Sequence, residues 1–346
     1  MNYKYISKKK EVYIKRRMND FFKKARKMSK QEECFYCGKK ENKFCKSHSI
    51  PKFILKNIES KEGKILNNNS ILEVPAVKDI NGTKEAGTFS LICRDCDSKI
   101  FADYENSSFE KEELNQKILA QISMKINLKT IYRKINNKNE NILLYNEFNY
   151  SKAKNNNEVV DMDLLEAIKE FEKAKEINLK LKKEEYHIYY YKELEYVVPI
   201  AFQDSVALYL DLDDSIINDI YYYDKDYEIK NMYICIFPLK EKSILFMYVD
   251  DDSKRYRPFF RKFNKMSEEK QLELINYIIF LYSENIFISP DIKRTLLQDY
   301  KLKKASRTSK FDNYIGIVPL KMLKEEYTLS NSAEIPNFLD KRNRLR

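Results

Sequence analysis

The segment "CFYCGKKENKFCKSHSIP", residues 34 to 51, holds three of the six cysteines and one of the two histidines in a chain of 346 residues. A second Cys-x-x-Cys pair follows in "CRDC", residues 93 to 96. Each pair supplies two thiolates at the spacing of structural zinc sites, which take four tetrahedral ligands. The sequence therefore predicts one structural Zn²⁺ ion with the ligands Cys34, Cys37, Cys93 and Cys96.

The order of these pairs also indicates a fold. A cysteine knuckle, short strands, and a helix whose first turn carries the last two cysteines form a treble clef. This segment has little apolar material of its own, so we expect metal binding and folding to be coupled. Gly38 suits the turn that follows Cys37. Cys45 is either a spectator or a replacement for one ligand, and Cys235, in an apolar strand, is expected in the core.

Positive charge is concentrated at the start of the chain. Residues 1–30 contain twelve Lys or Arg and two acids, whereas the remaining residues contain 52 bases and 51 acids. A basic arm or helix next to a zinc unit favours contact with nucleic-acid phosphates. The side chains expected to make it are Lys15, Arg16, Arg17, Lys23, Lys24, Arg26 and Lys27. A solvated arm and an anionic membrane or partner surface are the alternatives.

The rest of the chain mixes helical and strand patterns. We expect helices at 109–135 and 163–181, a polar surface excursion over 136–160, and a helix from 267 with Ser267 as its N-cap. Strands are expected at 186–191, 195–202 and 206–212, with a hairpin at 232–249 that turns at 238–242. The predicted fold class is α+β, with a zinc-bound treble-clef (ββα-metal-like) unit followed by a larger α+β domain with antiparallel strands. Its parts are a basic arm or helix (1–30), the zinc domain (31–106) and a companion domain (107–346).

The sequence favours a cytoplasmic protein with no membrane partner. No apolar run approaches the roughly 20 residues that span a bilayer. The first residues are charged and lack the apolar stretch of a secretory signal. Thiols stay reduced in the cytoplasm, so the paired cysteines there indicate metal rather than disulfides.

Three motifs carry a resemblance to a known family. "SHSIP" (47–51), "LICRDCD" (91–97) and "FADYE" (101–105) resemble the zinc-bound HNH (His-Me finger) nucleases over residues 32–106, and above all bacterial variants reading "SHIIPKFLL … CxxC … F..YE". The resemblance implies a metal-dependent endonuclease that hydrolyses phosphodiester bonds. His48 would be the general base and Asp97 a ligand of Mg²⁺ or Mn²⁺. It also implies DNA ahead of RNA as the substrate, and a role in bacterial anti-phage defence.

Two positions depart from the family pattern. The acid that usually precedes the histidine is Ser47 here, and the Asn that orients it is missing near Thr88. The missing carboxylate could come from Asp95, Asp103 or Glu105. Three roles for His48 stay open: general base, structural residue and zinc ligand. The alternative function is a non-catalytic zinc module that binds nucleic acid or a protein partner, with homo-oligomerisation through the companion domain as a further option.

Overall fold

The main element of the fold is a seven-stranded sheet in which every neighbouring pair is antiparallel. The computed structural model describes residues 8–41, 43–73, 79–105, 114–180, 185–222, 227–311 and 320–346. The strands, in their order across the sheet, are β3 (Ile80–Gly82), β2 (Lys64–Asn67), β9 (Ile286–Ile288), β6 (Ile200–Val206), β7 (Met232–Pro238), β8 (Ser243–Asp250) and β5 (Tyr186–Leu194). The predicted α+β class with antiparallel strands is confirmed.

Both faces of the central strands β7 and β8 are buried, whereas the edge strand β5 is partly exposed. Along β7, Met232 and Ile234 belong to one apolar cluster, whereas Tyr233 and Cys235 belong to the other. Successive side chains of a strand point to opposite faces. This explains why "MYICIFP" is apolar throughout and why all of its residues are buried.

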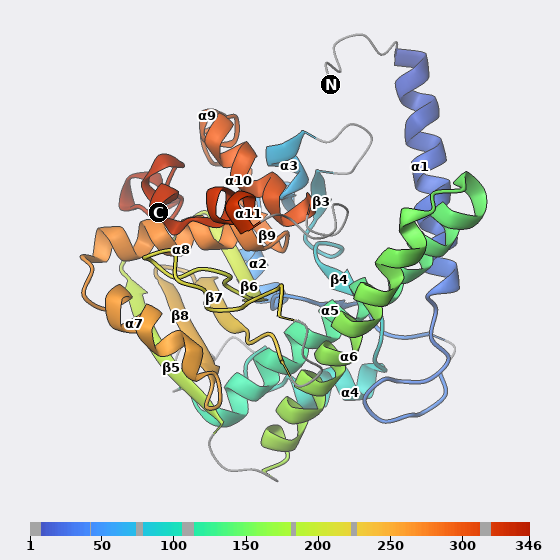
Figure 1. Cartoon of the computed structure of the whole chain (residues 1–346), viewed down its shortest axis with the longest axis horizontal. Coiled ribbons are helices and arrows are strands. Elements are labelled where there is room, and N and C mark those ends of the chain that lie inside the picture. The colour runs from blue at the N-terminus through green and yellow to red at the C-terminus, as the bar shows by residue number, and fades with distance from the viewer. Residues whose placement is uncertain are drawn as a thin grey trace.

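Helices cover the two faces (Figure 1). One cluster includes side chains of α7 (Arg257–Phe263), α8 (Glu268–Tyr282), α10 (Tyr300–Phe311) and α11 (Leu320–Tyr327). The other includes α2 (Lys52–Lys56), α5 (Gln116–Phe148), α6 (Lys152–Asn178) and the cysteine-bearing segment. The short helices are α3 (Asn69–Leu72), α9 (Arg294–Leu297) and the 3₁₀ turns η2 (Lys254–Tyr256), η3 (Leu329–Glu334) and η4 (Lys341–Asn343). Within the described ranges, no helix has the length and apolar character needed to cross a membrane.

A second, two-stranded sheet lies in the cysteine-bearing segment. β1 (Ser47–His48) pairs antiparallel with β4 (Thr88–Phe89), so that His48 lies opposite Thr88. The helix α4 (Arg94–Ile100) follows, with Cys93 as its N-cap.

Several local predictions are confirmed and others are wrong. The Ser267 side chain caps α8 by accepting from Lys270 N, and the β7–β8 hairpin turns at 239–242. The polar stretch 136–160 is not an excursion, because α5 continues to Phe148 and turns at Asn149 (φ 52°) into α6. Two of its asparagines donate their amides to carbonyls four residues back, Asn136 to Tyr132 O and Asn139 to Ile135 O, and so remain within the helix. No strand forms at 206–212 beyond the end of β6.

The basic segment forms α1 (Lys8–Met28), and residues 1–7 lie outside the described residues. Ala25 is buried, and Phe21 lies 6.4 Å from Phe148, between ring centroids. Lys24 Nζ pairs with Glu147 Oε1 at 2.8 Å. These contacts fix α1 along the far end of the α5–α6 hairpin (Figure 1).

The large sheet draws strands from both sides of the predicted domain boundary. β2 and β3 belong to the zinc segment, yet Leu66 pairs with Ile288 of β9. The boundary itself, between 106 and 107, falls in a stretch outside the described residues. The division into 1–30, 31–106 and 107–346 therefore stays a prediction, with a continuous sheet across it.

Candidate functional site

Four cysteine sulfurs form a compact cluster. The Sγ atoms of Cys34, Cys37, Cys93 and Cys96 all lie within 4.8 Å of one another. A zinc ion bonds to thiolate sulfur at about 2.3 Å, so sulfurs at this spacing fit around one tetrahedral ion. The four predicted ligands are thus brought together, and they could hold a metal such as zinc.

Local backbone geometry shapes this cluster. Gly38 adopts φ +69°, a left-handed conformation that favours glycine, and its N–H donates to Cys34 O at 2.8 Å. The Cys93 N–H donates to the Cys34 sulfur at 3.3 Å. Burial raises the pKa of Cys34, but the N–H groups of Cys37, Cys93 and Tyr36 outweigh it and lower the pKa to about 7. The thiolate form that a metal requires is therefore favoured at this residue.

The remaining cysteines lie outside the cluster. Cys45 donates its thiol to Ile92 O at 3.2 Å, and burial raises its pKa to about 12. It is thus a spectator of the four-cysteine set. Cys235 is fully buried in β7, which confirms its predicted place in the core.

His48 is half-buried and bonds to a backbone carbonyl. Its Nε2 lies 3.1 Å from Thr83 O, and because a carbonyl only accepts, Nε2 carries the proton. Its Nδ1 has no hydrogen-bond partner among the described residues. Burial lowers the pKa of His48, as do the charges of Lys52 and Lys125, so the imidazole is neutral near pH 7. The cysteine cluster does not include His48.

Asp97 lies in a buried charge network instead of an open cleft. Its Oδ1 accepts from Ser47 Oγ at 2.5 Å and from Lys125 Nζ at 2.9 Å. Lys125, on α5, has a fully buried side chain, and its Nζ also lies 2.8 Å from Ser47 Oγ and 2.8 Å from Glu105 Oε1. The Phe101 ring lies beneath it, 3.6 Å from Nζ to the centroid. Three oxygens and one ring thus surround a single ammonium.

The "FADYE" motif serves this network. Phe101 and Glu105 contact Lys125, and Asp103 accepts from Gln121 Nε2 at 2.5 Å and pairs with Lys117 Nζ at 2.8 Å. All of these partners lie on α5. The motif therefore attaches the end of the zinc segment to the long helix.

His48 and Asp97 make no hydrogen bond or ion pair with each other among the described residues, although the Asp97 charge acts on the pKa of His48. Neighbouring side chains on a strand point to opposite faces. Ser47 turns toward α4 and α5, whereas His48 turns toward the carbonyl of Thr83. A Mg²⁺ or Mn²⁺ ion at Asp97 does not fit these residues, because the carboxylate oxygen already accepts from an ammonium that would repel the ion.

The predicted phosphate-binding side chains share α1. Lys15, Arg16, Arg17, Lys23, Lys24, Arg26 and Lys27 are all exposed. Lys24 pairs with Glu147, whereas Lys15, Arg16, Arg17, Lys23 and Lys27 make no ion pair within the described part of the chain.

Sequence reasoning missed the basic residues of α5. Lys125, Lys129 and Arg133 recur every four residues and therefore share one face of that helix. Burial lowers the pKa of Lys129 to about 8, although the negative charge of Asp204 acts to raise it. The four-residue repeat of these cations was the signal available in the sequence.

No family model, curated protein or solved structure was found to match the chain. The HNH resemblance therefore stays a hypothesis drawn from the motifs of residues 32–106.

Proposed function

We propose that the chain is a nucleic-acid-binding protein in which a zinc-held unit and the long helix α5 support a basic helix, α1. The observation that carries this proposal is the set of exposed cations on α1, five of which make no ion pair among the described residues: Lys15, Arg16, Arg17, Lys23 and Lys27. Each Lys or Arg placed on a phosphate releases condensed counterions, which favours binding.

The zinc-held unit is proposed to be a treble clef with a ββα core. Its support is the order of elements: the first cysteine pair, the antiparallel β1–β4 pair, and α4, whose start carries Cys93 and Cys96. The ion would be Zn²⁺, with a structural role. This unit would hold α5 in place, since Lys125 binds it through three oxygens.

The hydrogen-bond and charge network around Lys125 favours the binding role over divalent-metal catalysis. Lys125 places a fixed positive charge at the carboxylate that the HNH resemblance assigns to the metal. Ser47, at the position of the second acid, is a neutral hydroxyl bonded to both partners. Ser47, one of the two departures from the family pattern, thus belongs to the same arrangement as Lys125.

The test is binding of a labelled oligonucleotide in buffer without Mg²⁺ or Mn²⁺, followed by fluorescence anisotropy. We expect wild type to bind, His48→Ala to bind equally, and the strand to be recovered at full length after incubation. Absence of binding to DNA and RNA at low salt would contradict the proposal.

The second candidate is the HNH-type endonuclease, in which His48 activates water. It is favoured by one observation: His48 is neutral, its Nε2–H is held by Thr83 O, and Nδ1 is left as a proton acceptor. Anti-phage defence is the biological setting that the resemblance adds.

A cleavage assay separates the two candidates. Supercoiled plasmid and single-stranded RNA are incubated with Mg²⁺ or Mn²⁺ and wild type, His48→Ala or Asp97→Asn, with zinc content measured for each. The endonuclease requires cleavage by wild type and its loss in His48→Ala at equal zinc content. The binding protein requires intact substrate in every lane.

A further inference from the structure

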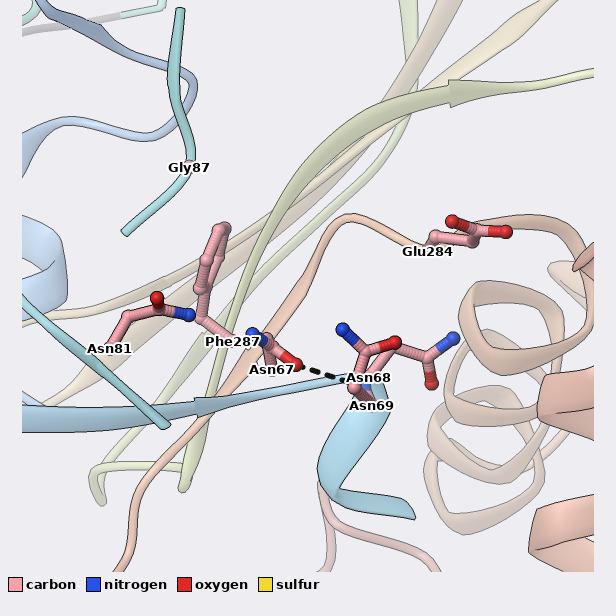
Figure 2. Close-up of a pocket in the computed structure, with 7 residues that line it drawn as sticks. All are labelled: Asn67, Asn68, Asn69, Asn81, Gly87, Glu284 and Phe287. Carbon is pink, nitrogen blue, oxygen red and sulfur yellow. Dashed lines mark hydrogen bonds between the residues drawn. The ribbon is translucent and has the colours of Figure 1, made fainter. Parts of the chain in front are cut away.

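A polar pocket lies next to the turn that holds His48. It measures about 200 Å³, and its lining is Asn67, Asn68, Asn69, Asn81, Gly87, Glu284 and Phe287. Figure 2 shows the amides of Asn68 and Asn69 rising from the start of α3 toward the space beneath the Glu284 carboxylate. Asn81 and Phe287 lie on the other side of this space.

Asn68 is the unusual residue of this pocket. Its side chain is buried, with 3% of the residue exposed, and neither its Nδ2 nor its Oδ1 has a hydrogen-bond partner. Its neighbours do bond within the protein, as Asn67 Oδ1 does when it accepts from Asn69 N at 2.9 Å. Buried polar groups in proteins are nearly always satisfied. Both amide atoms of Asn68 have less than 1 Å² of accessible surface, so the amide must turn toward the pocket to meet a ligand that offers a donor and an acceptor together.

The pocket and His48 share one turn. Asn81 and Gly87 lie on either side of Thr83, whose carbonyl binds His48. The carbonyl of Gly87 accepts at 2.9 Å from the N–H of Ser49, the residue that follows His48. A Cβ at Gly87 would lie 2.5 Å from Ser49 Oγ and 2.6 Å from Phe287 Cζ, so the close approach requires glycine.

The lining restricts the ligand's chemistry. It contains amides, one carboxylate and one aromatic ring, but no cation, so a phosphate is not held inside. An asparagine amide bonds in bidentate fashion to a base edge such as adenine N6 and N7, and a Glu carboxylate accepts from an exocyclic amino group. Drug-sized ligands occupy pockets of roughly 300 Å³ and more, so this smaller one suits a single ring system.

We propose that this pocket holds one unpaired nucleobase with an exocyclic amino group, as in adenine and cytosine. Asn68 reads the base edge and Glu284 accepts from the amino group. This inference rests on the proposed nucleic-acid binding and deepens it, because a base reaches such a pocket only from a single strand or as a free nucleoside. The basic helix would hold phosphates, and the pocket would choose the base.

The test compares labelled oligo(dA), oligo(dC) and oligo(dT) of one length, and a duplex of that length, by fluorescence anisotropy. Oligo(dA) and oligo(dC) should bind about tenfold more tightly than oligo(dT), as expected for one bidentate amide contact. The preference should persist as salt rises, because hydrogen bonds to a base release no counterions. Free adenosine and uridine, added as competitors, distinguish a nucleoside site from a strand site.

Asn68→Leu is the decisive variant. It should lower the affinity for oligo(dA) to the affinity for oligo(dT), and it should leave the affinity for oligo(dT) unchanged. Its thermal stability should equal or exceed that of wild type, because a buried amide without partners is removed. Glu284→Gln is the second variant, with the same expected loss of preference, and Asn264→Leu, at an exposed site after α7, is the matched control.

Two results would overturn the inference while leaving the proposed function intact. One is equal binding of all three homopolymers by wild type. The other is a preference that survives in both Asn68→Leu and Glu284→Gln. Direct binding of adenosine, measured by calorimetry, together with no binding of any strand would contradict the proposed function and assign the pocket to a free nucleoside.

Discussion

Lys125 connects the motifs of the zinc segment to the rest of the molecule. Ser47, Asp97 and Glu105 come from three separate motifs, and all three place an oxygen within 2.9 Å of its Nζ. Moving an ammonium out of water costs several kcal/mol. Two carboxylates, a hydroxyl and the Phe101 ring offset this cost, so the arrangement depends on each member being present.

Replacing Lys125 by Met should therefore lower the free energy of unfolding by about 3–5 kcal/mol, because two partly buried carboxylates lose their counter-charge. Denaturant unfolding measures this change. Lys117→Met, which removes an exposed pair with Asp103, is the control and should cost about 1 kcal/mol or less. Equal stability of Lys125→Met and wild type would show that the ammonium does not hold the zinc segment to α5.

The pH dependence of stability should report on His48. Its pKa in the folded chain is lowered below the ordinary value of about 6.5, so the unfolded chain binds more protons as the pH falls through that value. The His48 contribution to the free energy of unfolding should accordingly decrease between about pH 7 and pH 5.5, whereas Glu140 and Asp250, whose pKa values burial raises to about 7, contribute with the opposite sign in wild type and variant alike. His48→Gln should flatten this decrease, whereas His187→Gln, at an exposed strand position, should not. Identical profiles for wild type and His48→Gln would contradict a neutral, buried imidazole.

At the scale of elements, the cysteine knuckles were predictable and the contacts around them were not. The spacing of Cys34, Cys37, Cys93 and Cys96 identifies the cluster because ligand geometry is local to each pair. The repeat that contains Lys125 could be read from the sequence, but its partners could not, because they lie up to 78 residues away. Likewise, β9 is three residues long and too short for a strand pattern to show.

The lengths of α5 and α6 were predicted wrongly. The asparagine-rich stretch after residue 136 has weak helix propensity, which favoured a surface excursion. Packing between the two helices overrides propensity there, and Asn149 in the left-handed conformation ends α5. Side-chain contacts between distant segments thus decided what local composition could not.

The zinc-held unit makes a direct prediction about metal content. Cys37→Ser and Cys96→Ser should each release the metal and lower the cooperativity of unfolding, because three ligands no longer close a tetrahedral site. Cys45→Ser should keep the metal, since its thiol bonds to Ile92 O outside the cluster. Metal analysis of the purified variants measures this. A metal-free wild type, or loss of metal in Cys45→Ser, would contradict the four-cysteine assignment.

On the scale of the whole molecule, the basic helix α1 and the helix α7 lie at opposite ends. α1 extends along the far end of the α5–α6 hairpin, whereas α7 covers the other side of the sheet (Figure 1). The sheet joins both regions, since β2 and β3 of the zinc segment continue into β9 and β6. A charge variant on α7 therefore tests net charge alone, while one on α1 tests the proposed binding surface.

The most direct test of the account is the salt dependence of oligonucleotide binding. The measurement is the slope of log K against log salt for wild type, for the α1 triple variant Lys15→Ala, Arg16→Ala, Arg17→Ala, and for the matched variant Arg257→Ala, Arg261→Ala, Lys265→Ala, whose residues are also exposed.

For a single strand, each phosphate contact contributes about 0.7 to this slope, so three lost contacts should make it shallower by about 2. We expect this shallower slope and weaker binding in the α1 variant. The matched variant should keep the wild-type slope. Equal slopes and affinities for wild type and the α1 variant would contradict the claim that α1 binds nucleic acid.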